Sequence, residues 1–149
     1  MPRIERTAEI SWEGNLARGE GLISAGTSGA FSALAYSMPT RVGQAEGKTS
    51  PEELLAAAHG GCITMSLAGE LTTLGHPAER IDVTCRIVMD EVEGQGHQIV
   101  GSVVTVTVRA SGLEEAGLAE AARLADEGCP FSALLKRAGA TVEVSSRLA

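Results

Sequence analysis

One uncharged stretch constrains the fold of this chain more than any other feature. Ser50 stands at a helix N-cap position, Pro51 at the first helical position and Glu53 at the third, which is the pattern of a helix start. Residues 54–69 carry no formal charge, and the helix is predicted to end near Leu74, before a glycine and a proline. Apolar side chains on every side of a helix predict a buried central element.

A membrane span is the competing interpretation of the same stretch. The uncharged segment is short for a bilayer, and it contains His59 and the pair Gly60 and Gly61. We therefore expect a core helix and no membrane association. Residues 1–6 contain no apolar signal core, which predicts a cytoplasmic protein.

Shorter patterns on both sides of this helix predict a single α+β domain over residues 1–149. A capping-box pattern at residues 111–114 predicts a helix that ends near Asp126, and a further helix is expected over 131–138. Residues 37–50 are polar and rich in turn formers, which predicts a loop. The expected strands are 8–12, 22–23, 31–36, 81–90, 100–109 and 141–145.

The charge balance excludes several functions. Lys and Arg total 12 against 19 Asp and Glu, which gives a formal net charge of −7, and only 3% of the residues are aromatic. Nucleic-acid binding needs clustered basic residues or stacking aromatic rings, so no nucleic-acid partner is expected. A short chain whose core is rich in Ala and Val buries little apolar area, so dimerisation would help it to fold.

The three cysteines have different local settings. An odd number without a secretory signal argues against a purely structural disulfide framework. Cys85 lies on the apolar face of an alternating strand and is interpreted as structural, and a small core residue is also the simplest interpretation of Cys62. Cys129 precedes Pro130 at a helix N-cap, where free N–H groups and the helix dipole favour a thiolate.

Other site chemistries have little support in the sequence. The three cysteines with His59, His76 and His97 could suggest zinc, but no C-x-x-C or H-x-x-x-H pairing is present, so no metal is expected. A G-x-S-x-G elbow and a phosphate-binding loop are also lacking. His59 is therefore interpreted as a core histidine or a local hydrogen-bond partner.

Three parts of the chain together resemble the OsmC/Ohr family of thiol peroxidases: Arg41, the segment TSPEELLAAAHGGC at 49–62, and Gly-Cys-Pro at 128–130. His59 and Trp-Glu-Gly at 12–14 favour the OsmC branch. The resemblance covers essentially the whole chain. It implies an OsmC-like fold and an intertwined homodimer, with long central helices flanked by antiparallel-rich β-sheets.

The resemblance also implies an activity, the reduction of organic hydroperoxides, with hydrogen peroxide generally a poorer substrate. By position, Cys62 would be the peroxidatic thiol and Cys129 the resolving thiol, while Arg41 and Glu52 would orient and activate Cys62. No cofactor is expected, but an external dithiol, such as a lipoyl- or thioredoxin-type protein, would be required as the reductant.

Helix geometry predicts that this site is shared between subunits. Glu52 and Cys62 are ten residues apart, which is about 15 Å along one helix. If two such helices cross antiparallel about Ala57, Glu52 of one lies beside Cys62 of the other, so the partner would supply Glu52 and Arg41. The alternative function is a non-catalytic dimeric protein on the same fold that binds a small hydrophobic ligand.

Overall fold

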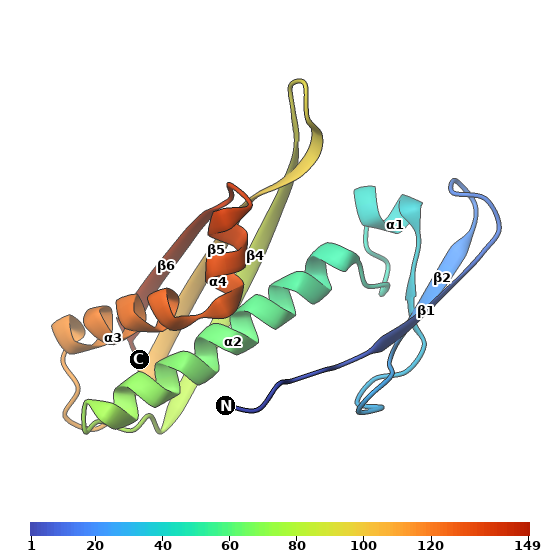
Figure 1. Cartoon of the computed structure of the whole chain (residues 1–149). Helices are drawn as coiled ribbons and strands as arrows, with labels where there is room; N and C mark the ends of the chain where they lie inside the picture. The colour runs from blue at the N-terminus through green and yellow to red at the C-terminus, as the bar shows by residue number, and fades with distance from the viewer. The chain divides into compact units, whose positions relative to one another are not determined.

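The computed structural model describes residues 1–149 and divides into two units, Met1–Pro51 and Glu52–Ala149. The first unit contains an antiparallel sheet, drawn in blue in Figure 1, with strand order β1-β2-β3. Its strands are β1 (Ala8–Glu13), β2 (Glu20–Ala25) and β3 (Leu34–Tyr36). The expectation of one domain over residues 1–149 stays a prediction.

A glycine sets the packing of the first sheet. Gly21 pairs with Trp12 on one side and with Tyr36 on the other, and the two rings meet edge to face at a centroid distance of 5.5 Å. A Cβ at position 21 would collide with the Tyr36 ring, so only glycine allows this contact. Every residue of β1 is exposed, including Ile10, so much of the apolar surface of this sheet is uncovered within one chain.

The prediction of a loop over residues 37–50 is wrong for its first part. A short helix, α1 (Met38–Val42), forms there and carries Arg41. The Ser37 hydroxyl accepts a hydrogen bond from the Thr40 backbone N–H, and Pro39 in the first turn already has a helical φ angle. The polar composition of residues 37–50 is typical of a loop, but Ser37 and Pro39 in it form the capped start of a helix.

The second unit is built on a three-stranded sheet with strand order β4-β5-β6. Strands β4 (Arg80–Val92) and β5 (Gly96–Arg109) form a long antiparallel hairpin, and β6 (Thr141–Leu148) runs parallel to β5. Gly94 and Gly96 at the hairpin turn have positive φ angles, which glycine adopts without steric cost. The strands expected over 81–90 and 100–109 are the two arms of this hairpin, and both are longer than expected.

Three helices cover one face of this sheet: α2 (Pro51–Thr73), α3 (Glu115–Gly128) and α4 (Pro130–Arg137) (Figure 1). Val104, Val106 and Val108 point from β5 into the core by two-residue alternation. They pack with Leu67 of α2 and Leu118 of α3, all fully buried. The α+β class that the sequence predicts is confirmed.

Burial of α2 on every side, which its apolar composition predicts, does not occur within one chain. His59, Ile63, Leu67 and Leu71 recur at four-residue intervals and form one fully buried stripe, whereas Met65 on another face is 79% exposed. By length and composition α2 could cross a membrane, a test that the core helix of a soluble protein also passes. Its buried stripe belongs to the core of the second unit.

The start of α3 differs from the predicted capping box at residues 111–114. The N-cap is Glu114, and no side chain caps this helix. The Ser111 hydroxyl donates to the Glu79 carboxylate at 2.9 Å, and Gly112 has a φ of +72°, outside the helical region. The serine is therefore used by a contact to a distant residue instead of by the helix.

Candidate active site

Cys62 and Cys129 meet where α2 and α4 come together. Cys62 is half-buried on α2, and Cys129 is 99% buried in front of α4. Their Sγ atoms lie 3.1 Å apart, and both residues are free thiols. This separation is longer than the S–S bond of about 2.05 Å, so a small displacement would join them.

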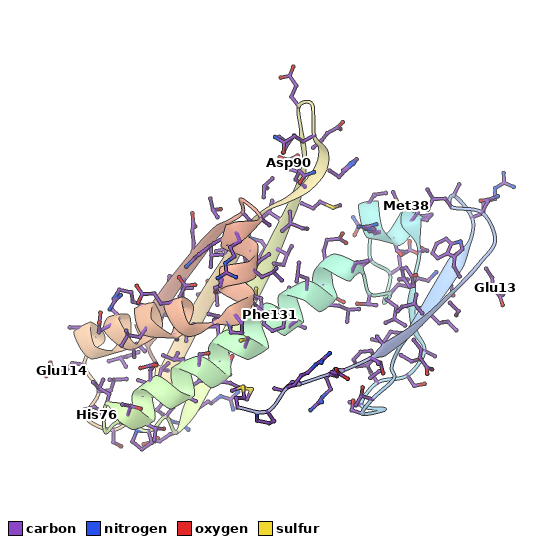
Figure 2. All side chains as sticks on the ribbon, in the orientation of Figure 1. Glu13, Met38, His76, Asp90, Glu114 and Phe131 are labelled. Atoms are coloured by element: carbon purple, nitrogen blue, oxygen red, sulfur yellow. The ribbon has the colours of Figure 1, made fainter.

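The first turn of α4 directs one backbone N–H at each of the two sulfurs. The Ser132 backbone N–H donates to Cys129 Sγ at 3.5 Å, which makes the Cys129 sulfur the N-cap of the helix, as the sequence predicts. The Phe131 backbone N–H is directed at the Cys62 sulfur. Figure 2 labels Phe131 at the start of α4.

The Cys62 thiol resists ionisation within one chain. Burial raises the pKa of Cys62 to about 11, and the neighbouring Cys129 sulfur acts in the same direction. The Phe131 N–H and the Ser66 hydroxyl oppose this rise in pKa, because each donates to the sulfur and so favours the thiolate. A nucleophilic thiol at neutral pH therefore needs a further positive charge near Cys62.

Arg41 and Glu52, the other two predicted site residues, are not brought to Cys62 by the fold of the second unit. Arg41 lies on α1, in the first unit. Glu52 lies in the first turn of α2, ten residues before Cys62 and about 15 Å along the same helix. Their roles stay predictions.

His59 lies beside the thiol pair as part of a buried hydrogen-bonded group. Its Nδ1 lies 2.7 Å from Ser102 Oγ and its Nε2 lies 2.8 Å from Ser132 Oγ. Burial lowers the pKa of His59, so the imidazole is neutral at physiological pH. The interpretation of His59 as a hydrogen-bond partner agrees with these contacts.

Ser66, Ser102 and Ser132 belong to the site but are not among the residues predicted for it. Ser66 follows Cys62 by one helical turn and Ser132 follows Cys129 by three residues, so both spacings were available as signals. No local pattern identifies Ser102, because only the tertiary fold brings β5 to His59.

Cys85 is separate from the thiol pair. It is half-buried on β4, and its sulfur lies 3.4 Å from Ser102 Oγ. No group of three or more His, Cys, Asp or Glu side chains is arranged to hold a metal ion.

Comparison with protein families identifies the chain. The model of the OsmC-like protein family matches residues 43–145, well over half of its length. The chain belongs to the OsmC-like family. The matched range contains Cys62 and Cys129, together with the helix and strands around them.

Relatives of this OsmC-like chain have names that refer to redox chemistry. The Escherichia coli (strain K12) protein named peroxiredoxin OsmC is 32% identical over 133 residues, which are 89% of this chain and 91% of that protein. A Legionella pneumophila structure, described as an organic hydroperoxide resistance protein OsmC, has a TM-score of 0.70 at 22% identity and covers 97% of this chain and 98% of its own. The organic hydroperoxide resistance protein OhrB of Bacillus subtilis has a TM-score of 0.66 at 23% identity, covering 96% and 98%. The two structures confirm the OsmC-like fold.

Proposed function

We propose that this chain is a thiol-dependent peroxidase that reduces organic hydroperoxides. Family membership and a relative named a peroxiredoxin support a redox enzyme of the peroxidase type. The observation that carries the finer proposal is the 3.1 Å approach of two free thiols, Cys62 and Cys129, at the start of α4.

The first chemical step is attack by the Cys62 thiolate on the peroxide. Its sulfur takes the terminal oxygen of ROOH, the O–O bond breaks, and the leaving alkoxide takes a proton to become ROH. Cys62 is then a sulfenic acid. The sulfur has been oxidised by two electrons, which the peroxide has gained.

Cys129 resolves the sulfenic acid. Its sulfur attacks Cys62 Sγ, a disulfide forms and water leaves with the hydroxyl of the sulfenic acid and the thiol proton. The Ser132 backbone N–H holds the attacking sulfur at the start of α4. An external dithiol then exchanges with the disulfide, is itself oxidised, and returns both cysteines to thiols.

The cation required by Cys62 is assigned to Arg41. A pKa near 11 leaves on the order of 10⁻⁴ of the thiol ionised at pH 7, too little for efficient attack. A guanidinium stays charged when buried, and its planar fork can hold a carboxylate while it faces a sulfur. Glu52 is that carboxylate in this proposal.

The proposed enzyme is a homodimer in which α2 packs against its twin. Small residues, Ala56, Ala57, Gly60 and Gly61, form the α2 side of a groove of about 360 Å³ whose other side is Val83 and Cys85 of β4, and a second helix could approach closely there. The exposed Met65 and Ile10 are apolar surface that a second copy would cover. An antiparallel crossing at Ala57 places the partner's Glu52 beside Cys62.

Thiol counting after oxidation tests the proposal. One equivalent of cumene hydroperoxide is expected to reduce the free thiols of the wild-type chain from three to one, because Cys62 and Cys129 are consumed. Cys62→Ser is expected to keep both remaining thiols. Cys129→Ser is expected to reduce one equivalent and stop, with one added oxygen at Cys62 by peptide mass spectrometry.

The same measurement separates the proposal from its alternative. A wild-type chain that keeps all three thiols after treatment is not a thiol peroxidase, and the non-catalytic binding protein would then be the better hypothesis. A Cys62→Ser variant that still turns over hydroperoxide would contradict the role of Cys62.

A further inference from the structure

A buried polar network connects α2 with β5 and α4. His59 on α2 has no exposed surface, and neither have Ser102 on β5 and Ser132 on α4. The two ring nitrogens lie 2.7 Å and 2.8 Å from the two hydroxyl oxygens. A neutral imidazole has one donor and one acceptor, so the serine hydroxyls can satisfy both nitrogens in either tautomer.

Ser132 links this network to the thiol pair. Its side chain bonds to His59, while its backbone N–H donates to Cys129 Sγ at 3.5 Å. His59 and Cys62 are three residues apart and therefore neighbours on the surface of α2. The first turn of α4 is thus attached to α2 at two adjacent points, through the imidazole and through the sulfurs.

We propose that His59 is a positioning residue for the disulfide step, acting through Ser132 to hold Cys129 within bonding reach of Cys62. Its physiological meaning rests on the proposed peroxidase function. His59 touches neither sulfur of the pair by a hydrogen bond of its own, so it acts on where α4 begins and not on the reacting atoms. Ser102 fixes the other side of the ring.

The geometry explains why such a restraint matters. The sulfurs are 3.1 Å apart and must approach by about 1 Å to bond. A well-held partner group makes the step effectively unimolecular, and a misplacement of about 1 Å can lower its rate by about 100-fold. The start of α4 contacts the Cys62 sulfur through the Phe131 N–H but supplies no reacting atom to peroxide attack, whereas Cys129 reacts in the second step. Loss of the restraint should therefore slow the second step more than the first.

A thiol–disulfide equilibrium tests the proposal without peroxide. The reduced chain is mixed with oxidised and reduced dithiothreitol, so that the Cys62 and Cys129 thiols pass two electrons and two protons to oxidised dithiothreitol as their disulfide forms. Ser132→Ala removes the hydroxyl that contacts His59 and keeps the backbone N–H that donates to Cys129 Sγ. We expect its equilibrium constant for disulfide formation to fall at least tenfold. Ser145→Ala, at an exposed position on β6, is expected to match the wild type.

His59→Gln is the second variant, and a kinetic measurement separates positioning from general loosening. After rapid mixing with cumene hydroperoxide, positioning predicts at least tenfold slower disulfide formation in both Ser132→Ala and His59→Gln, with a smaller change in the rate of sulfenic acid formation at Cys62. A merely structural defect would slow both steps equally. Far-UV circular dichroism shows whether each variant is folded. If His59→Gln does not fold, Ser132→Ala alone still tests the proposal.

The outcomes for the two proposals are distinct. Equal equilibrium constants in the wild type and Ser132→Ala would overturn the positioning role, and so would equal slowing of both kinetic steps. A wild type that forms the disulfide with dithiothreitol but does not react with cumene hydroperoxide would overturn the peroxidase proposal alone.

Discussion

At the residue scale, some neighbours of the Cys62 sulfur raise its pKa and others lower it. Burial and Cys129 raise its pKa to about 11, while the Phe131 N–H and the Ser66 hydroxyl act against them. A neighbouring guanidinium lowers a thiol pKa by about 1–3 units, so Arg41→Ala is expected to raise the pKa of Cys62 and slow its alkylation at pH 7 by about 10-fold to 1,000-fold. The pH dependence of iodoacetamide labelling at Cys62, followed by peptide mass spectrometry, measures this.

Arg18→Ala is the control for that experiment, since Arg18 is an exposed arginine of the same unit. It removes the same charge from the chain but is expected to leave the labelling curve of Cys62 unchanged. Identical curves for Arg41→Ala and the wild type would remove Arg41 from the site.

His59 makes the stability of the fold depend on pH. Burial lowers the pKa of His59. Of the charged groups near it, Asp126 on α3 raises this pKa and Lys136 on α4 lowers it. The Cys85 thiol of β4 lies 3.9 Å from Nδ1. Below pH 6.5 His59 binds a proton in the unfolded chain but stays neutral in the folded chain until the pH is lower. The free energy of unfolding therefore falls as the pH decreases, by at most about 1.4 kcal/mol per pH unit from this group.

Urea unfolding at pH 7.0 and pH 5.5 measures this contribution. The difference between the two pH values is expected to be smaller in His59→Gln than in the wild type, because the substituted side chain does not titrate. An equal difference in the two proteins would show that His59 is not the group responsible.

At the element scale, local signals predicted the helices and strands except α1, and they predicted none of the contacts between residues distant in sequence. The start of α2 at Pro51 and the Cys129 cap of α4 depend on a few adjacent residues, and both were predicted. The capping box at Ser111 failed because Glu79, distant in sequence, takes the hydroxyl. The Ser102 contact to His59 joins residues 43 positions apart, which no local periodicity encodes.

The crossing of α2 over β4 depends on a small residue. A Cβ added at Gly60 would lie 3.1 Å from Cys85 Cβ and 3.7 Å from Val83 Cγ1, whereas one added at Gly69 on the same helix meets no atom within 4 Å. Gly60→Val is therefore expected to lower the free energy of unfolding by about 1–3 kcal/mol through overpacking. Gly69→Val is expected to show no such loss in urea unfolding, and similar losses in both variants would indicate a general effect of the substitution.

At the scale of the whole molecule, the apolar surface left uncovered by one chain is the main argument for a second copy. The exposed face of α2 carries Ala57, Gly61 and Met65, and β1 is exposed along its whole length. A sheet and a helix with bare apolar faces are typical of a chain whose partner completes its core. Completion of the thiol site by the partner's Glu52 would then follow from the same crossing of helices.

Two glycines of α2 test this arrangement. Gly61 lies one turn from the proposed crossing point at Ala57, while Gly69 lies about 18 Å from it along the helix. A Cβ at either position meets nothing within 4 Å in one chain, and alanine favours a helix over glycine by about 1 kcal/mol, so neither Gly→Ala change should destabilise the fold of the chain itself. Across a close helix pair the added methyl group of Gly61→Ala would overpack the interface by about 1–3 kcal/mol, which is about 5-fold to 150-fold in the dimer dissociation constant. Sedimentation equilibrium should show this weakening for Gly61→Ala and none for Gly69→Ala, and equal dimer strength in both would place the α2 crossing elsewhere.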